Sequence, residues 1–432
     1  MKSVRQIFVI DDLHPEDNSM LQALYSRSPN SVVKHLDKVK GSDSGTFMEK
    51  FYIGYGHKSI ADCGTTTLFV ENVSMLAAKA IQDWPLYSGQ EASTRYLDYS
   101  VQEVLNPLES AEGKLIQDEW MKFYVEGKSS VVEHLKMLYP IKEGEDSKVY
   151  DRAINAKSFD IMRGFLPAGA TTYLSWHTNL RQAYEKIQLL LHHPLTEIRE
   201  IAEDLKNKLS EKYSHSFIYK QYPEQEAFFE KCAQKYTYFF DEKHSDFEMN
   251  TNVSAKDLEM YSDILLSRPI KTNLPSFMGK LGQFNFKFLL DFGSFRDVQR
   301  HRNGENLMPL LTTKLGFYPW YISMLPESFK EKAKAFLAEQ EAKISALPCD
   351  DFVRQYYIAM GYTVGVDITY RLPAAIYVSE LRSDTTVHPT LRVRAQQMGR
   401  SIVEKFPLIK MHINEMETEW DIRRGKQDIV EK

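Results

Sequence analysis

The sequence has few cysteines and lacks the short motifs of several common enzyme classes. Cys63, Cys232 and Cys349 are far apart and form no C-x-x-C pair, which argues against a disulfide framework and a zinc knuckle. No G-x-G-x-x-G follows an expected strand, because Gly279 and Gly282 stand alone, and there is no G-x-x-x-x-G-K-[ST] loop. Since H-E-x-x-H is also absent, we expect no Rossmann fold, no P-loop and no metal site.

The chain also lacks a strong charge bias and a long apolar run. The net charge of −5 over 432 residues gives no global basic field for binding nucleic acid. No stretch approaches the roughly 18 apolar residues of a membrane span, and the acidic start has no signal-peptide core. We therefore expect a cytoplasmic protein that binds neither nucleic acid nor membranes.

The most informative feature that is present is an imperfect internal repeat. When the sequence is shifted by 217 positions against itself, Lys79 falls on Arg296. The triplet R-H-R at 300–302 then falls on D-W-P at 83–85. The segment G-Q-E-A-S-T-R-Y at 89–96 has no such counterpart in the second copy. Each copy therefore keeps chemically useful groups that the other lacks.

A second pair of matching segments divides the chain into domains. Residues 166–181 and 372–382 share L-P-A, then Y-[LV]-S and L-R. We expect a first half over 1–220 and a second half over 266–432, each of ordinary domain size. Between them, 221–265 is dense in Phe, Tyr, Lys and Glu and is interpreted as a helical connector.

The local patterns predict an α+β fold rather than a doubly wound sheet. Strands are expected at 65–73, rich in Thr, Phe and Val, and at 283–290, where Phe alternates with other residues. Helices are expected at 15–40, 74–82, 109–139, 146–165, 182–213, 326–346 and 392–406. The expected architecture is two tandem halves, mostly helical with a small sheet in each, packed as a pseudo-dimer.

Arg300, His301 and Arg302 concentrate positive charge over three residues. The planar fork of donors on an arginine matches a phosphate or a flat ring that bears oxygen atoms. Repulsion from both arginines should lower the pKa of His301 and leave a neutral imidazole. The alternative interpretation is a solvated basic turn at the end of a helix.

The segment after Gly89 offers groups of a complementary kind. Ser93, Thr94 and Arg95 supply two hydroxyls and a guanidinium that suit a phosphate, and Glu91 can accept from a ring N–H. The alternative is a polar turn that opens a helix.

Taken together, these motifs resemble the flavin-dependent thymidylate synthases. The signature of that family is R-H-R, seven residues, and then S-x-R-Y. The second half keeps R-H-R at 300–302, and the first half keeps S-x-R-Y at 93–96, seven residues after 83–85. Further family motifs are matched by Gly56-His57-Lys58-Ser59, by Arg163, Leu166-Pro167, Thr172 and Asn179-Leu180-Arg181, and by Glu380-Leu381-Arg382, His388-Pro389 and Arg392. The resemblance covers about 40–225 and 270–407.

The resemblance implies reductive methylation of dUMP to dTMP, with FAD as hydride carrier, methylenetetrahydrofolate as carbon donor and NADPH as reductant. The family builds its active sites between subunits. A fused pair of copies that keeps one of two symmetric sites can therefore lose R-H-R in one half and S-x-R-Y in the other. We expect one composite site, and a homodimer that forms a pseudo-tetramer.

The resemblance also implies roles for individual residues. Arg392 and Arg300 would be catalytic, and dUMP would be bound by Glu91, Ser93, Thr94, Arg95, Arg300 and Arg392. The cofactor would be bound by Ser59, Glu91, Asn179, Arg181, Arg300, His301, Arg302 and Arg382. Asp297 departs from the family, which has a Gln three residues before R-H-R. Two alternatives stay open: a related flavin enzyme acting on another pyrimidine nucleotide, and a non-catalytic protein that binds flavin or nucleotide.

Overall fold

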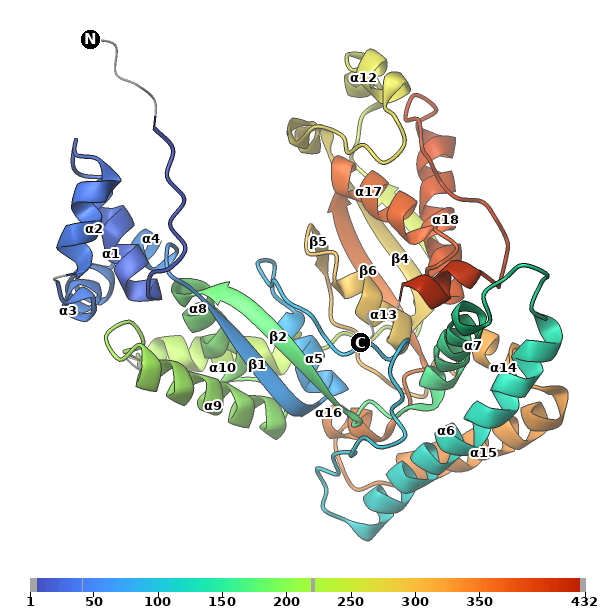
Figure 1. Cartoon of the computed structure of the whole chain (residues 1–432). Helices are drawn as coiled ribbons and strands as arrows, with labels where there is room; N and C mark the ends of the chain where they lie inside the picture. The colour runs from blue at the N-terminus through green and yellow to red at the C-terminus, as the bar shows by residue number, and fades with distance from the viewer. Residues whose placement is uncertain (1–5, 41, 219–221, 428–432) are drawn as a thin grey trace. The chain divides into compact units, whose positions relative to one another are not determined.

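The computed structural model describes residues 6–40, 42–218 and 222–427. The α+β prediction is confirmed, because most elements are helices and the strands form one sheet of two and one of four (Figure 1). The chain divides into two compact units, and each is assembled from separate stretches of sequence. Unit 1 takes its residues from 1–70, 86–90 and 174–237, and unit 2 from 71–85, 91–173 and 238–432.

Unit 1 is mainly helical. The expected helix over 15–40 is two helices, because Pro29 between them has no N–H to continue a helix. Pro194 likewise separates two helices within the expected span 182–213. The helices of unit 1 are α1 (Pro15–Tyr25), α2 (Val32–Lys40), α3 (Ser44–Met48), the π-helical turn η1 (Glu49–Gly54), α4 (Lys58–Ala61), α8 (Leu180–Leu190), α9 (Thr196–Lys212) and α10 (Pro223–Tyr236).

Strands β1 (Thr65–Ser74) and β2 (Thr171–Asn179) form the two-stranded sheet. Each of these strands has residues in both units. β1 confirms the expected strand at 65–73, whereas β2 was not anticipated from the sequence.

Unit 2 contains the four-stranded antiparallel sheet, in the order β3-β4-β6-β5. In the expected strand, Phe284, Phe286 and Phe288 are buried at every second position, and Phe286 lies opposite Ile368. This alternation turns one row of aromatic side chains towards the core. The strands are β3 (Phe247–Thr251), β4 (Gln283–Asp291), β5 (Gly304–Asn306) and β6 (Thr363–Arg371).

Helices surround this sheet in unit 2. Helices α17 and α18 pack against strands β4 and β6, while α6 and α15 lie side by side (Figure 1). The rings of Phe123 and Phe336 stack between the latter pair at 4.4 Å. The helices are α5 (Met75–Gln82), α6 (Ala111–Leu138), α7 (Ser147–Met162), η2 (Arg163–Phe165), α11 (Ala255–Glu259), α12 (Ser262–Ser267), η3 (Ser276–Leu281), α13 (Phe292–Gln299), α14 (Pro319–Ser323), α15 (Glu327–Ser345), α16 (Asp351–Arg354), η4 (Gln355–Tyr357), α17 (Leu372–Arg382), α18 (Pro389–Lys405) and η5 (Ile422–Lys426).

The segment 221–265, interpreted from the sequence as a helical connector, also supplies a strand. Its described part contains α10, α11 and most of α12, with β3 between α10 and α11. Met249 of β3 lies opposite Phe286 of β4, so this segment forms one edge of the four-stranded sheet. The alternation of Phe247, Met249 and Thr251 was the available sequence signal for a strand.

The first part of the repeat is reproduced in the structure. Helices α5 and α13 have the same length and begin 217 positions apart, and each follows a strand. Both are capped by the preceding residue: Ser74 Oγ accepts from Ala77 N, and Asp291 Oδ1 accepts from Ser294 N. The two copies therefore share one strand-to-helix unit.

The second sequence alignment, between 166–181 and 372–382, is wrong. Leu166 comes before strand β2, whereas Leu372 is the first residue of helix α17. The structural match is instead β2–α8 with β6–α17, which agree in length at a shift of 192 positions. The shared letters misled because short apolar patterns occur in strands and helices alike.

At this shift, equivalent segments of the two copies bond to each other inside unit 2. Ala168 N donates to Ile358 O at 2.9 Å, and Met360 N donates to Leu166 O at 2.8 Å. At this shift Ala168 corresponds to Met360, and Leu166 corresponds to Ile358. Each bond therefore joins the same donor position of one copy to the same acceptor position of the other. Such reciprocity is the property of a twofold contact. The two copies therefore meet here about a pseudo-twofold axis.

Within the part of the chain that the structure describes, no helix has the length and apolarity needed to cross a membrane. In the same part, no group of three or more His, Cys, Asp or Glu side chains could hold a metal ion. The cysteines are free, and burial raises the pKa of the Cys63 and Cys349 thiols. Neither of these two thiols is therefore activated as a nucleophile.

Candidate functional site

Glu91 lies at the centre of a buried cluster of ion pairs in unit 2. Its carboxylate is 1% exposed, and it contacts Lys79 Nζ at 2.8 Å, Arg300 Nη2 at 3.6 Å and the guanidinium of Arg296. Gln82 Nε2 donates to it at 2.9 Å. Since Lys79 and Arg296 occupy equivalent positions of the repeat, both copies of the helix supply a cation to one carboxylate.

The charges of this cluster hold Glu91 ionised. Burial alone would raise the pKa of Glu91, but Arg296, Lys79 and Arg300 outweigh it and hold the pKa well below its usual range. Burial lowers the pKa of Lys79 to about 8, although Glu91 opposes this shift. Glu91 is therefore an acceptor here, and its expected contact with a ring N–H stays a prediction.

The R-H-R triplet follows helix α13 directly. The Arg300 side chain is 41% exposed, and Arg302 is exposed and makes no ion pair within the described residues. His301 Nε2 accepts from Arg382 Nε at 2.6 Å, which requires a neutral ring. The pKa of His301 is lowered to about 3, as expected in direction, but burial is the main cause and Arg382 comes next.

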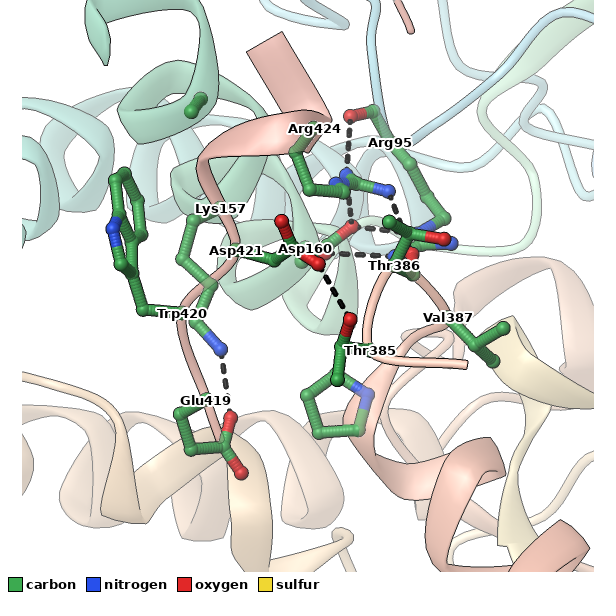
Figure 2. A pocket seen from close by; sticks show the side chains of 12 residues that line it. Arg95, Lys157, Asp160, Thr385, Thr386, Val387, Glu419, Trp420, Asp421 and Arg424 are labelled. Carbon is green, nitrogen blue, oxygen red and sulfur yellow. Dashed lines mark hydrogen bonds and ion pairs between the residues drawn. The ribbon is translucent and has the colours of Figure 1, made fainter. Parts of the chain in front are cut away.

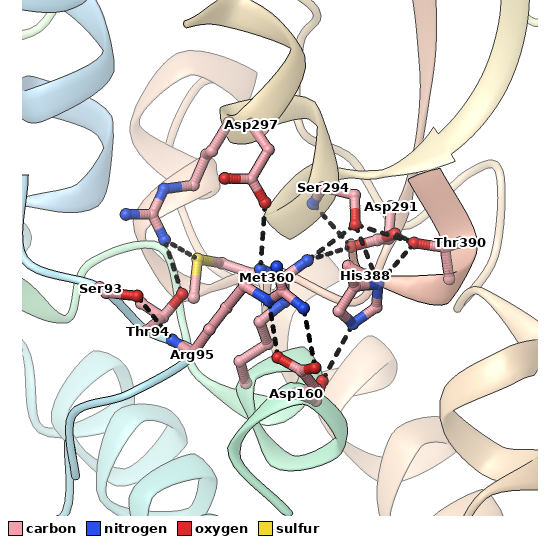
Figure 3. Close-up of polar contacts among 12 residues, drawn as sticks. Ser93, Thr94, Arg95, Asp160, Asp291, Ser294, Asp297, Met360, His388 and Thr390 are labelled. Carbon is pink, nitrogen blue, oxygen red and sulfur yellow. Dashed lines mark hydrogen bonds and ion pairs between the residues drawn. The ribbon is translucent and has the colours of Figure 1, made fainter. Parts of the chain in front are cut away.

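The S-x-R-Y segment is held by groups from other parts of unit 2 (Figure 3). Arg95 Nε and Nη2 donate to the two oxygens of Asp160 at 2.7 and 2.9 Å, a bidentate pair. Thr94 Oγ1 accepts from Arg296 Nη1 at 3.4 Å, and Ser93 Oγ accepts from Arg95 N at 3.3 Å. Arg95 thus already has one carboxylate partner within the protein.

Asp297, which stands where the family has a Gln, lies among several arginines and offsets their positive charge. It lies 3.5 Å from Arg163 Nη1 and 3.8 Å from Arg300 Nε, and its carbonyl oxygen accepts from Arg382 Nη2 at 3.0 Å. Burial raises the pKa of Asp297, but Arg300, Arg163 and Arg382 hold it well below its usual range. Asp297 therefore provides negative charge beneath the R-H-R triplet.

His388 is buried and fixed in one neutral form (Figure 3). Its Nε2 lies 3.2 Å from the carbonyl oxygen of Asp160, which can only accept, so Nε2 carries the proton. Its Nδ1 then accepts from a hydroxyl, with Thr390 Oγ1 at 2.8 Å and Ser294 Oγ at 3.2 Å. Burial lowers the pKa of His388 well below its usual value. Its contacts are structural, since they tie α18 to α7 and α13.

Arg392 on α18 is almost fully buried, at 4% exposure. Its Nη1 reaches the carbonyl oxygen of Thr385 at 3.5 Å, at the outer limit of a hydrogen bond. Its Nε is buried and has no hydrogen-bond partner within the described residues. An unpaired buried donor of this kind is uncommon in folded proteins.

Unit 2 has a cavity of about 710 Å³ beside these groups, and five of its lining residues are cationic. They are Arg95, Lys271, Arg382, Arg423 and Arg424, against the carboxylates Glu380 and Asp384. A second pocket of about 20 Å³, drawn in Figure 2, lies beside Asp160 and has room for about one water molecule. The large cavity has the size and the charge for an anionic small molecule.

Comparison with known proteins finds a family model that matches the first half of the chain. Residues 9–213 match the family model Thy1, described as thymidylate synthase complementing protein. The first half of the chain is therefore similar to the Thy1 family. This match confirms the resemblance to flavin-dependent thymidylate synthases, and the chain is about twice as long as the matched range.

The chain is also similar along most of its length to three proteins named UPF0159. The protein of Chlamydia muridarum is 23% identical over 440 residues, which cover 88% of this chain and 83% of the relative. The one from Chlamydia pneumoniae is 24% identical, covering 84% and 79%. The one from Thermoplasma acidophilum is 23% identical, covering 90% and 93%. The likeness therefore extends beyond the Thy1 match into the second half.

Three residues expected at the cofactor lie in unit 1, within the Thy1 match, and have local contacts there. Asn179 Oδ1 caps α8 by accepting from Gln182 N at 2.8 Å. Arg181 Nη1 pairs with Asp62 at 3.1 Å, and Ser59 is exposed on α4. Their contacts with a cofactor stay predictions.

Sequence reasoning missed several members of the polar network beside the Thy1 motifs. Asp160 and Arg424 have no motif of their own, and only their partners in space identify them. Lys79 and Arg296 had a signal, because the repeat aligned two cations at equivalent positions.

Proposed function

We propose that this chain is a flavin-dependent thymidylate synthase that converts dUMP to dTMP. FAD would carry the hydride, methylenetetrahydrofolate would donate the carbon, and NADPH would be the reductant. One composite site would be formed by the S-x-R-Y segment of the first half and the R-H-R segment of the second. The Thy1 match supports the general role, which is that of a thymidylate synthase complementing protein.

The observation that carries the proposal is that residues next to each of these two segments contact the other segment or its neighbours within unit 2. Arg300 lies 3.6 Å from Glu91, and Arg296 lies 3.4 Å from Thr94, although more than 200 positions separate them in the sequence. Neither copy keeps both segments, so a site that uses both would have the complete set of groups. A single working site that takes one motif from each copy is the simplest explanation for this complementary loss.

The residues present fit a flavin. Arg302 is exposed without an ion pair within the described residues, and neutral His301 has a ring that can lie against a planar group. When bound, FAD supplies hydride transfer. Positive charge on Arg300 and Arg302 would stabilise negative charge on its ring, and Arg382 would hold His301 in the accepting form. Within unit 2, Glu91 completes the proposed cofactor contacts.

Arg392 is the proposed group that polarises the pyrimidine. Its buried Nε–H has no hydrogen-bond acceptor within the described residues. A preorganised donor of this kind stabilises developing charge most effectively where water is excluded. Ser93, Thr94 and Arg95 are the proposed contacts to the rest of dUMP. Glu91 would accept from the substrate or the cofactor while Lys79 and Arg296 keep it ionised.

The test is spectroscopic and then kinetic. We expect the purified protein to bind FAD, with flavin absorbance, and to oxidise the reduced flavin when dUMP and methylenetetrahydrofolate are added. Formation of dTMP with NADPH is the final readout, and gel filtration tests the proposed homodimer. A protein that binds no FAD in equilibrium dialysis and forms no dTMP would contradict the proposal.

A second candidate, a related protein with another nucleotide or without turnover, is favoured by one observation. Arg95 is already paired with Asp160, and Arg300 is shared between Glu91 and Asp297. A substrate phosphate must compete with these carboxylates. Binding of pyrimidine nucleotides other than dUMP, or flavin binding without dTMP formation, would favour this candidate.

A further inference from the structure

The segment that follows α18 in the sequence is anchored on α7 and on Tyr139, the residue directly after α6, both from the other half. The ring of Trp420 stacks on that of Tyr139 at 5.2 Å, and Glu419 pairs with Lys157 Nζ at 2.7 Å. A Cβ at Gly425 would lie 1.9 Å from Val149 O, so only glycine allows this approach. The backbone of 419–427 is therefore fixed in place against α7.

This anchoring brings Arg424 into the polar network of the proposed site (Figure 2). The Arg424 side chain is 8% exposed, and its guanidinium lies 4.7 Å from the centre of the Tyr96 ring. Its Nη2 lies 3.2 Å from Asp160, the carboxylate that also holds Arg95. Arg424 thus contacts Tyr96, which belongs to the S-x-R-Y segment, and Asp160, which binds that segment through Arg95.

Two buried guanidinium groups share one carboxylate at this point. The other acceptors of Arg424 are the carbonyl oxygens of Thr386, Arg95 and Ala156, at 3.3 to 3.5 Å, which are long for hydrogen bonds. Burial, and then Arg95, lower the pKa of Arg424, while Asp160 opposes them. A buried cation in excess of its partners is costly unless an anion accompanies it.

The position of this excess charge indicates where the anion lies. Arg95 and Arg424 both line the cavity of about 710 Å³. Lys271, in the same lining, has a φ of 60°, a left-handed conformation that is unusual for a residue other than glycine. Glu380, a lining carboxylate, is already paired with Arg268. The wall around Arg424 therefore favours a negatively charged group.

We infer that Arg424 binds the phosphate of the nucleotide substrate together with Arg95, which makes segment 419–427 part of the substrate site. This inference rests on the proposed function. A phosphate dianion would replace the long carbonyl contacts of Arg424 with charge-assisted hydrogen bonds. It would also supply the missing negative charge beside Asp160.

The test is the binding of dUMP and of deoxyuridine to Arg424→Ala, measured by calorimetry. Hydrogen bonds to charged groups contribute enough to predict that dUMP binds about tenfold to a hundredfold more weakly. Deoxyuridine, which has no phosphate, should bind both proteins equally. Lys426→Ala is the matched control, because Lys426 is an exposed cation in the same segment.

Two further measurements separate phosphate binding from a role in folding. The Tm without ligand should change little in Arg424→Ala, whereas the increase in Tm that dUMP causes should become smaller. Arg424→Lys, which keeps the charge, should recover part of the affinity. Wild-type affinity for dUMP in Arg424→Ala, or an equal loss for dUMP and deoxyuridine, would overturn the inference.

Inorganic phosphate distinguishes this inference from the proposed function. If the parent protein does not bind dUMP, the proposed function fails, and phosphate binding still tests Arg424 alone. Weaker phosphate binding by Arg424→Ala, with Lys426→Ala unchanged, would then support an anion site for a different nucleotide. Equal phosphate binding by all three proteins would refute the role of Arg424.

Discussion

The Glu91 cluster gives the sharpest test of the energetics, through the substitution Glu91→Gln. The substitution keeps the shape of the side chain and removes its charge. Lys79 and Arg296 would then stay buried together without their shared carboxylate, because both are almost fully inaccessible to water. Removing one partner of a buried ion pair typically costs about 3 to 5 kcal/mol. Because two cations lose their partner here, we expect a loss of at least about 3 kcal/mol in the free energy of unfolding.

Denaturation with urea measures this loss, with Glu331→Gln as control. Glu331 pairs with Lys334 on the surface of α15, so its substitution should leave the midpoint nearly unchanged. A loss for Glu91→Gln as small as that of the control would refute the assignment of a buried, charged cluster.

The pH dependence checks the same reasoning with its sign. The cations hold the pKa of Glu91 in the folded state below its unfolded value, so ionised Glu91 stabilises the folded protein above about pH 4.5. That contribution is lost as the pH falls towards the folded pKa. The parent protein should therefore lose more stability than Glu91→Gln between about pH 5 and 3. Parallel curves for the two proteins would contradict this account.

The remaining predictions concern the proposed site and the anchored segment. Arg392→Ala should lower the rate of dTMP formation about a hundredfold to a thousandfold while flavin binding changes little, and Asp83→Ala in the slot that lost R-H-R should barely change the rate. Arg95→Ala should raise KM for dUMP more than it lowers kcat, because a phosphate contact is similar in ground and transition states; steady-state kinetics measure both. Gly425→Ala should lower the Tm clearly, since its Cβ would overlap Val149 O, and an unchanged Tm would show that the segment is not fixed there.

The sequence was sufficient for the elements whose signals are local. Helix α5 was located because its segment follows a β-rich run and has a helix-forming composition, whereas its equivalent α13 was not among the expected helices. Strand β3 was missed because it is only five residues long and lies in a segment rich in helix-forming residues. The alternation of Phe247, Met249 and Thr251 is a short local signal, and the pairing with β4 that completes the strand is not visible in the sequence.

The site was predictable only where a motif marks it. Arg300 and Arg95 belong to the R-H-R and S-x-R-Y motifs, so their importance could be inferred before the structure. Asp160 and Arg424 contact Arg95 from positions 65 and 329 residues away, and no local pattern identifies such partners. The second repeat was misaligned for a similar reason. Leu166 and Leu372 are both followed by Pro-Ala, but Leu166 precedes a strand and Leu372 begins a helix.

The positions equivalent to the site in the other copy show how the duplication has been used. At the shift of 217 positions, Glu91 corresponds to Met308 and Thr94 to Leu311, and both apolar side chains are buried. At the shift of 192 positions, Arg163 corresponds to Gln355, which accepts from Leu311 N at 2.9 Å rather than from a charged group. One copy therefore packs as core where the other holds ionised groups. Because buried charges are costly to maintain without a ligand or partners, their concentration in one of two equivalent places favours a single composite site over two reduced ones.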